Sequence, residues 1–184
     1  MLISADRSAL LVIDVQERLL NHVDGWQAIL DNVIWLVEVA KRIGVPIMLT
    51  EQYPKGLGGT VPVLAKEFAP AMVAEKVHFS CAAANCLPTM TGGDREQMVL
   101  CGIESHVCVM QTVLGLLAKG DEVHVAWDAV SGRGEAYVRH ALERMRQAGA
   151  VITNHESVGF EWMRDKQHPR FRAMSELFKA GQPV

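Results

Sequence analysis

The chain has 184 residues, a net charge of -3, 49% apolar residues and 21% charged residues. This composition is typical of a globular protein, and the length predicts one domain over 1–184. The slightly acidic balance argues against a nucleic-acid partner, since the sequence indicates no basic face. No apolar stretch approaches the ~20 residues of a membrane helix, so we expect no membrane partner.

The cysteines point to a reducing compartment. Cys81, Cys86, Cys101 and Cys108 form no C-x-x-C pair and suggest no disulfide framework. The first seven residues do not have the pattern of a signal peptide. We therefore expect a cytoplasmic protein.

The first predicted strand is the apolar run 8–15, which places Asp14 near its carboxyl end. A helix that begins at Asp24 or Gly25 runs to about Ile43, where Gly44 ends it. In open α/β sheets ligands bind outside the carboxyl ends of the strands. Asp14 is therefore a candidate functional carboxylate, although a cap or a salt-bridge partner is an equal alternative.

The second buried strand is predicted over 45–50, and a loop rich in Gly and Pro follows over 51–62. The loop lacks a complete phosphate-binding motif, so we interpret it as a mobile rim of the site. Tyr53 is the loop side chain most suited to touch a ligand. A short helix is predicted over 63–68, and 81–91 is interpreted as a short helix and loop.

Lys76 follows, with apolar neighbours on its C-terminal side. Most lysines lie on the surface, and a lysine drawn into the cleft beside Asp14 is the functional alternative.

The apolar run 98–101 predicts a strand buried on both faces, and Gly102 interrupts it. Ser105 is then expected to cap a helix whose first turn contains Cys108. The unpartnered N–H groups and the dipole at a helix N-terminus favour a thiolate and can hold an oxyanion. The alternative is a structural cysteine buried in an ordinary turn.

The rest of the chain continues the alternation of strand and helix. We expect a turn at 119–121, a strand over 122–127, a loop over 131–134, a helix over 137–147 that ends near Gly149, a strand over 150–153, a helix capped by Ser157 up to about 165, and a last helical segment over 171–180. The pattern predicts an α/β fold, a three-layer, Rossmann-like open parallel sheet of about six strands.

The sequence resembles the isochorismatase-like cysteine hydrolases, the superfamily that includes nicotinamidases and N-carbamoylsarcosine amidohydrolase. The resemblance covers about 7–160 and depends on three segments: Leu-Val-Ile-Asp-Val-Gln at 11–16, the Lys76 segment that ends in Phe-Ser at 79–80, and Gly-Ile-Glu-Ser-His-Val-Cys-Val at 102–109. Each motif is weak alone, and the three in this order are specific.

The resemblance implies a catalytic triad of Asp14, Lys76 and Cys108, in which Cys108 attacks a carbonyl or imino carbon and forms a covalent intermediate. It also implies a non-proline cis peptide at Ile103–Glu104, with the Glu104 and Cys108 N–H groups as the oxyanion hole. We expect hydrolysis of a small amide, carbamoyl or related C–N substrate. A homo-oligomer, a dimer or larger, is also implied.

The substrate-binding residues expected at the rim are Gln16, Tyr53, Phe79 and His106. Metal-using nicotinamidases carry an Asp-x-His motif after the second strand, and the corresponding Thr-Glu-Gln-Tyr-Pro at 50–54 contains no His. We therefore expect no metal and no cofactor, and His78 and His106 are interpreted as structural or cleft-lining residues.

Two alternative functions stay open from the sequence. One is a non-catalytic homologue that acts as a binding protein, and such a chain would usually have a broken triad. The other is a redox-sensing thiol, which would need a resolving cysteine close to Cys108.

Overall fold

The computed structural model describes residues 2–180, which form a six-stranded sheet with the order β3-β2-β1-β4-β5-β6. Each pair of neighbouring strands is parallel, and β1 lies in the middle between β2 and β4. The strands are β1 (Ser8–Ile13), β2 (Ile47–Gln52), β3 (Val73–Lys76), β4 (Gln97–Ile103), β5 (Glu122–Ser131) and β6 (Val151–Thr153). The expected α/β class and the parallel sheet are confirmed.

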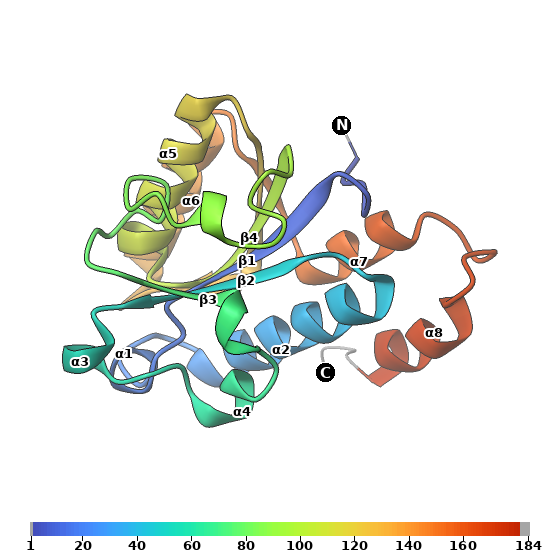
Figure 1. The fold of residues 1–184 in the computed structure, drawn as a ribbon, viewed down its shortest axis with the longest axis horizontal. Helices are drawn as coiled ribbons and strands as arrows, with labels where there is room; N and C mark the ends of the chain where they lie inside the picture. Colours follow the sequence, from blue (N-terminus) through green and yellow to red (C-terminus); the bar gives the residue numbers. More distant parts are fainter. Residues whose placement is uncertain (1, 181–184) are drawn as a thin grey trace.

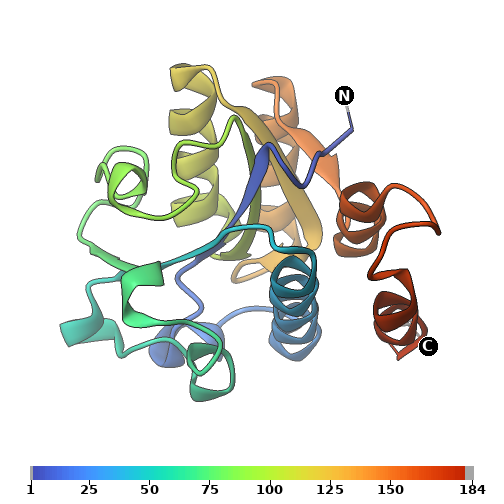
Figure 2. The same ribbon diagram turned by 45° about the vertical axis from the view of Figure 1, so that its right-hand side comes forward.

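Helices cover both faces of the sheet, which gives three layers (Figures 1 and 2). Helices α5 and α6 lie on one face, and α2, α7 and α8 lie on the other. The helices are α1 (Glu17–Leu20), α2 (Trp26–Ile43), α3 (Pro54–Leu57), α4 (Pro62–Ala65), α5 (Met110–Lys119), α6 (Glu135–Gln147), α7 (His155–Met163) and α8 (Phe171–Ala180).

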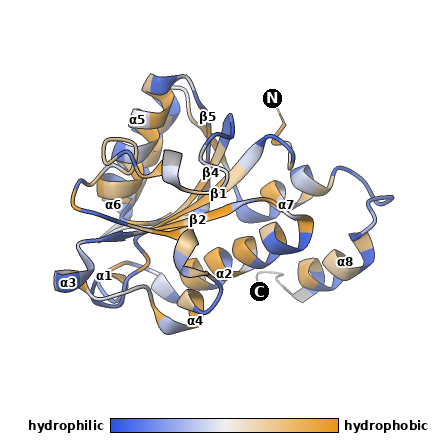
Figure 3. Ribbon diagram, viewed as in Figure 1, coloured by the Kyte–Doolittle hydropathy of each residue, from blue (hydrophilic) through white to orange (hydrophobic). Residues whose placement is uncertain are grey.

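The sheet supplies side chains to a separate apolar core on each side. In β1, Leu10 and Val12 pack into the core beneath α2 and α7, whereas Leu11 and Ile13 pack into the core beneath α5 and α6. Successive side chains of a strand point to opposite faces, so a strand covered twice is apolar at every position. Figure 3 shows these apolar strands between helices whose outer sides are polar.

Several element boundaries differ from the sequence expectation. Strand β2 extends to Gln52, and β5 extends to Ser131 because an irregularity in its pairing with β4 lets the ladder resume at Val130. Helix α7 is capped by Asn154, whose Oδ1 accepts the Ser157 N–H at 2.7 Å, so the expected Ser157 cap is wrong. Asn is among the strongest caps because its short side chain reaches a free N–H of the first turn.

The turn after β4 also differs from the expectation. Residues Ser105–Val109 form a π-helical turn with Glu104 at its N-cap position, and α5 begins only at Met110. The Ser105 hydroxyl makes no hydrogen bond to the described residues, so the expected Ser105 cap is wrong. π-turns are common at functional sites, and this one contains Cys108.

Candidate active site

Asp14 is the first residue after β1, and its carboxylate is completely buried. Its φ of +52° is left-handed, a conformation uncommon for residues other than Gly, Asn and Asp. The Thr50 hydroxyl donates to Oδ1 at 2.7 Å, and the Lys76 ammonium donates to Oδ2 at 2.6 Å. Both carboxylate oxygens are therefore held by side chains from the two neighbouring strands on this side of β1.

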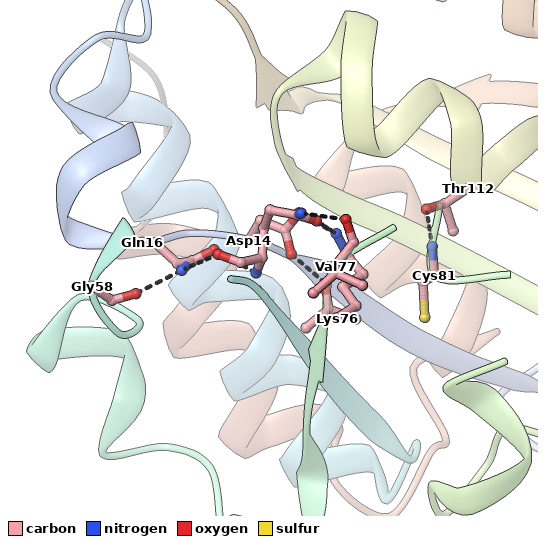
Figure 4. Close-up of polar contacts among 9 residues, drawn as sticks. Asp14, Gln16, Gly58, Lys76, Val77, Cys81 and Thr112 are labelled. Atoms are coloured by element: carbon pink, nitrogen blue, oxygen red, sulfur yellow. Dashed lines mark hydrogen bonds and ion pairs between the residues drawn. The ribbon is translucent and has the colours of Figure 1, made fainter. Parts of the chain in front are cut away.

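Lys76 ends the edge strand β3, and its side chain, like that of Asp14, has no exposed surface. Its ammonium donates to Asp14 and to Gln52 Oε1, the latter at 2.8 Å (Figure 4). Gln52 is the register partner of Lys76 in β2, so the two side chains lie on the same face of the sheet. Buried charges need this pairing, because an unpaired ion in an apolar interior is very costly.

Gln52, like Thr50, is a site residue that the sequence interpretation missed. Besides accepting from Lys76, it donates through Nε2 to the Val77 carbonyl at 2.8 Å. It lies at the carboxyl end of a strand, which is the position that drew attention to Asp14. A polar side chain at that position was the available signal.

Gln16 lies differently from its expected place at the rim. It is completely buried, its amide donates to the carbonyls of Gln52 and Gly58 at 3.0 and 2.6 Å, and it accepts the Gln52 N–H at 2.7 Å (Figure 4). Every hydrogen bond of this amide is made to backbone groups. Gln16 therefore holds the loop after β2 against the end of β1. It does not lie at the rim of the site.

Cys108 is 6% exposed and lies in the π-turn between β4 and α5. Burial raises the pKa of its thiol above the ordinary value of 9.0, the nearby Asp14 charge raises it further, and Lys76 opposes the shift. The three side chains that the sequence singled out therefore lie together at the carboxyl edge of the sheet.

The protonation state differs from the sequence expectation. A helix N-terminus was expected to favour the thiolate, but the raised pKa makes the neutral thiol the resting form. The physical reason is burial, which disfavours the charged form, together with the adjacent Asp14 carboxylate. Ionisation of Cys108 is therefore helped by a base, and the Asp14 carboxylate, whose charge acts on the thiol, is the candidate to accept the proton.

Glu104 joins β4 to the turn, and the peptide bond Ile103–Glu104 is cis, as the resemblance implied. Its carbonyl accepts the N–H groups of Val107 at 3.0 Å and Val109 at 3.2 Å. These two residues flank Cys108, so the Glu104 backbone holds the turn in place. The use of the Glu104 and Cys108 N–H groups as an oxyanion hole stays a prediction.

The remaining rim candidates lie at the surface. Tyr53 and Phe79 are about half exposed, at 54% and 51%. His106 is partly buried and stacks on Tyr137 with a centroid distance of 4.9 Å. His78 is exposed.

A second pair of thiols lies near the ion pair. Cys81 and Cys86 are buried and hydrogen bonded to each other, and both feel the charges of Lys76 and Asp14. The hydrogen bond from Cys81 lowers the pKa of Cys86 to about 7, despite the opposing effect of burial. These two thiols are therefore in electrostatic contact with the Asp14–Lys76 pair.

No trio of His, Cys, Asp or Glu side chains within residues 2–180 is arranged to hold a metal ion. In that same part of the chain, no helix has the length and apolarity to cross a bilayer. The groove along α6 has a volume of about 780 Å³ and is lined by residues such as Trp127, Leu142 and Ile152. Its lining does not include Asp14, Lys76 or Cys108.

Residues 8–157 match the model of the isochorismatase domain. The chain is 36% identical over 179 residues to isochorismatase family protein 1B of Dictyostelium discoideum, which covers 95% of this chain and 87% of the relative. A solved structure described as MAR1 ribonuclease, from Caenorhabditis elegans, is 34% identical, covers 100% of this chain and 95% of its own, and superimposes with a TM-score of 0.89.

Two solved structures of proteins called YcaC are also similar to this chain. The Pseudomonas aeruginosa protein, described with covalent acrylamide, is 26% identical with a TM-score of 0.84 and 97% of each chain covered. The Escherichia coli protein, described as an octameric hydrolase of unknown specificity, is 25% identical with a TM-score of 0.84, and 99% of this chain and 98% of that one are covered. With the matching domain model and the shared fold, these similarities show that the chain belongs to the isochorismatase family, within the isochorismatase-like cysteine hydrolase superfamily.

Proposed function

We propose that this protein hydrolyses a C–N bond of a small amide, carbamoyl or related compound, with Cys108 as nucleophile. The observation that carries the proposal is the fully buried Lys76–Asp14 ion pair at 2.6 Å, whose two charges both act on the Cys108 thiol. A nucleophile, a base and a cation that orients the base form the arrangement that covalent catalysis requires.

In the first step Asp14 takes the proton of Cys108 as the sulfur bonds to the substrate carbonyl carbon. The resulting oxyanion is stabilised by the N–H groups of Glu104 and Cys108. The C–N bond then breaks, and the proton held by Asp14 passes to the leaving nitrogen. This leaves a thioester on Cys108 and a free amine.

In the second step a water molecule attacks the thioester carbon, and Asp14 accepts one of its protons. The C–S bond breaks, the acid product leaves, and the proton returns to the sulfur. Lys76 keeps its ammonium on Asp14 throughout, so it stabilises the carboxylate charge in a buried site and orients the base. Each step is balanced by the substrate, water and these side chains alone.

The rim supports a small substrate with a planar group. Tyr53 and Phe79, each about half exposed, offer aromatic surface. The covalent acrylamide described for the P. aeruginosa relative gives a second line of support, since acrylamide is captured at its vinyl carbon by a reactive nucleophile. The first observation favours a planar substrate, and the second favours a reactive nucleophile.

The test is a screen of small amides and ureido compounds with the wild-type protein, Cys108→Ala and Cys86→Ala. We expect Cys108→Ala to lose turnover by a factor of roughly 10⁴ or more, because the nucleophile is gone. Mass spectrometry of stopped reactions should show an acyl adduct on the Cys108 peptide of the wild-type protein. The control Cys86→Ala removes a nearby thiol and keeps the triad.

Turnover by Cys108→Ala at the wild-type rate would overturn the mechanism. An intact triad with no adduct and no turnover on any compound would favour the non-catalytic binding protein instead.

RNA cleavage is a second candidate, favoured by the similarity to the C. elegans protein described as a ribonuclease, which is 34% identical to this chain. The net charge of -3 disfavours it, because affinity for the phosphate backbone comes mainly from basic side chains. Incubation of labelled RNA with the wild-type protein and Cys108→Ala separates the two functions. Cleavage that both proteins share equally would indicate a contaminating nuclease.

We also propose that the protein is a homo-oligomer in the cytoplasm. The octameric E. coli relative supports the assembly, and the four free thiols support a reducing compartment. Light scattering of the purified protein reports the mass of the assembly directly.

A further inference from the structure

The only charged partner of the Glu104 carboxylate among the described residues comes from the loop after β5. Arg133 Nε donates to Glu104 Oε1 at 2.6 Å, and Arg133 Nη2 donates to Oε2 at 3.0 Å. The carboxylate side chain is 8% exposed, whereas the arginine side chain is 63% exposed. This is a bidentate pair, the geometry in which an arginine fixes both the position and the orientation of a carboxylate.

The loop that carries Arg133 is itself fastened. The Ser131 hydroxyl donates to the Asp24 carbonyl at 2.8 Å, and the Gly132 carbonyl accepts the Asp24 N–H at 2.9 Å. These bonds tie the end of β5 to the segment before α2. Arg133 is therefore held at its base by one part of the chain and reaches to Glu104 in another.

Glu104 connects Arg133 to Cys108 in two ways. Its carbonyl holds the N–H groups of Val107 and Val109 on either side of Cys108. Its carboxylate is also one of the charges that act on the thiol. A displacement of Glu104 would therefore shift the turn that carries Cys108, and an unscreened Glu104 charge would disfavour the Cys108 thiolate.

Three charged side chains act on the Cys108 thiol, and a fourth, Arg133, is paired with one of them. Asp14 lies after β1 and Lys76 at the end of β3, and these two neutralise each other. Glu104 lies at the start of the turn, and Arg133 neutralises it from the loop after β5. Each of the two carboxylates near the sulfur is thus paired with a cation. Only the pair of Glu104 depends on a surface side chain, that of Arg133.

We propose that Arg133 is a positioning residue for the hydrolysis, because its guanidinium locks the Glu104 carboxylate and screens that charge from the Cys108 sulfur. The inference deepens the proposed function and rests on it for the role of Cys108. It does not place Arg133 in contact with the substrate. An arginine suits this role better than a lysine, since a lysine lacks the planar fork that binds both carboxylate oxygens.

The test measures the alkylation rate of Cys108 by iodoacetamide at one mildly alkaline pH, resolved by peptide mass spectrometry. No substrate is needed, so the result is independent of whether the proposed hydrolysis is correct. We expect Arg133→Ala to slow alkylation roughly tenfold, because an unscreened Glu104 charge opposes formation of the thiolate. Glu104→Gln should speed it, since that charge is removed while the side-chain shape is kept.

The double variant decides the proposal. Arg133→Ala in a Glu104→Gln background should have no further effect on alkylation, because no carboxylate is left to screen. Arg133→Lys should fall between the wild-type protein and Arg133→Ala. Arg144→Ala, an exposed arginine on α6, is the matched control and should keep the wild-type rate.

Turnover gives a second reading once a substrate is known. We expect Arg133→Ala to lower kcat more than it raises KM, because the proposed role acts through Glu104 on the Cys108 sulfur. The proposal is overturned if Arg133→Ala alkylates at the wild-type rate, or if it slows alkylation equally in the Glu104→Gln background. A substrate that Cys108→Ala still cleaves would refute the proposed function and leave the alkylation result standing.

Discussion

At the scale of single residues, the site depends on a carboxylate and an ammonium that are both completely buried. Asp14 and Lys76 are 62 positions apart in the chain, and their side chains meet at 2.6 Å. A buried ion pair is weak evidence for stability, because its desolvation offsets its attraction. We therefore interpret this pair as retained for function.

Removal of one partner should be much more costly than the pair itself is worth. We expect Lys76→Met to lower the free energy of unfolding by about 3–5 kcal/mol, since Asp14 is left buried without a cation. Lys41→Met breaks the partly exposed pair with Glu67 and should cost less than about 1 kcal/mol. Urea denaturation of both variants gives the comparison.

The double variant Asp14→Asn with Lys76→Met should recover part of the loss, because neither charge remains. If Lys76→Met is no less stable than Lys41→Met, the pair is not buried as described. Both site variants should lose turnover regardless of their stability.

At the scale of elements, the site depends on the close approach of β1 and β4. Gly102 lies opposite Ile13 in the sheet and has a φ of +112°. A Cβ at this position would lie 2.1 Å from the Ile13 carbonyl oxygen. Only glycine therefore allows the two strands to end side by side, immediately before Asp14 and the turn that carries Cys108.

Gly102→Ala should lower the free energy of unfolding by roughly 3 kcal/mol or more, because it combines a strained φ with a backbone clash. Gly120→Ala is the matched control, since Gly120 has a φ of +95° and no atom lies within 4 Å of an added Cβ. That variant should cost only about 1 kcal/mol. Equal losses in denaturation experiments would show that the strands do not approach this closely.

At the scale of the whole molecule, the buried thiols make stability depend on alkaline pH. Burial raises the pKa of Cys101 above its ordinary value of 9.0, and burial is also the first cause of the raised pKa of Cys108. Above 9.0 these thiols ionise in the unfolded chain but stay protonated in the folded protein. Their contribution to stability is thus complete below 9.0 and is lost as the pH rises beyond it.

We expect the free energy of unfolding to fall above this pH by up to about 1.4 kcal/mol per pH unit for each such thiol. Cys101→Ala should make the fall less steep, because one of the thiols is gone. Val99→Ala, in the same strand and equally buried, should lower stability at every pH without changing the slope. Identical slopes for the two variants, measured by denaturation across the alkaline range, would contradict this role of the buried thiols.

The placing of Asp14, Lys76 and Cys108 near one another is where sequence and structure agree most closely, and the surrounding hydrogen bonds are where they differ. Asp14 and Cys108 could be found because each follows an apolar strand, and such strands share one edge of a parallel sheet. Gln52 carried the same signal of a polar residue after an apolar strand, but its pairing with Lys76 depends on the register of β2 and β3, which the sequence does not show. Gln16 was taken for a rim residue because its local sequence does not reveal that the loop after β2 folds back over it.

The sequence by itself determined the α/β class, the parallel sheet and the candidate nucleophile, because apolar periodicity and turn residues are local signals. Only the tertiary structure decided the protonation of Cys108 and the pairing of Glu104 with Arg133. Burial and charge at the sulfur come from strands and loops that are distant along the chain. Such terms depend on distances in space, and a linear pattern does not encode them.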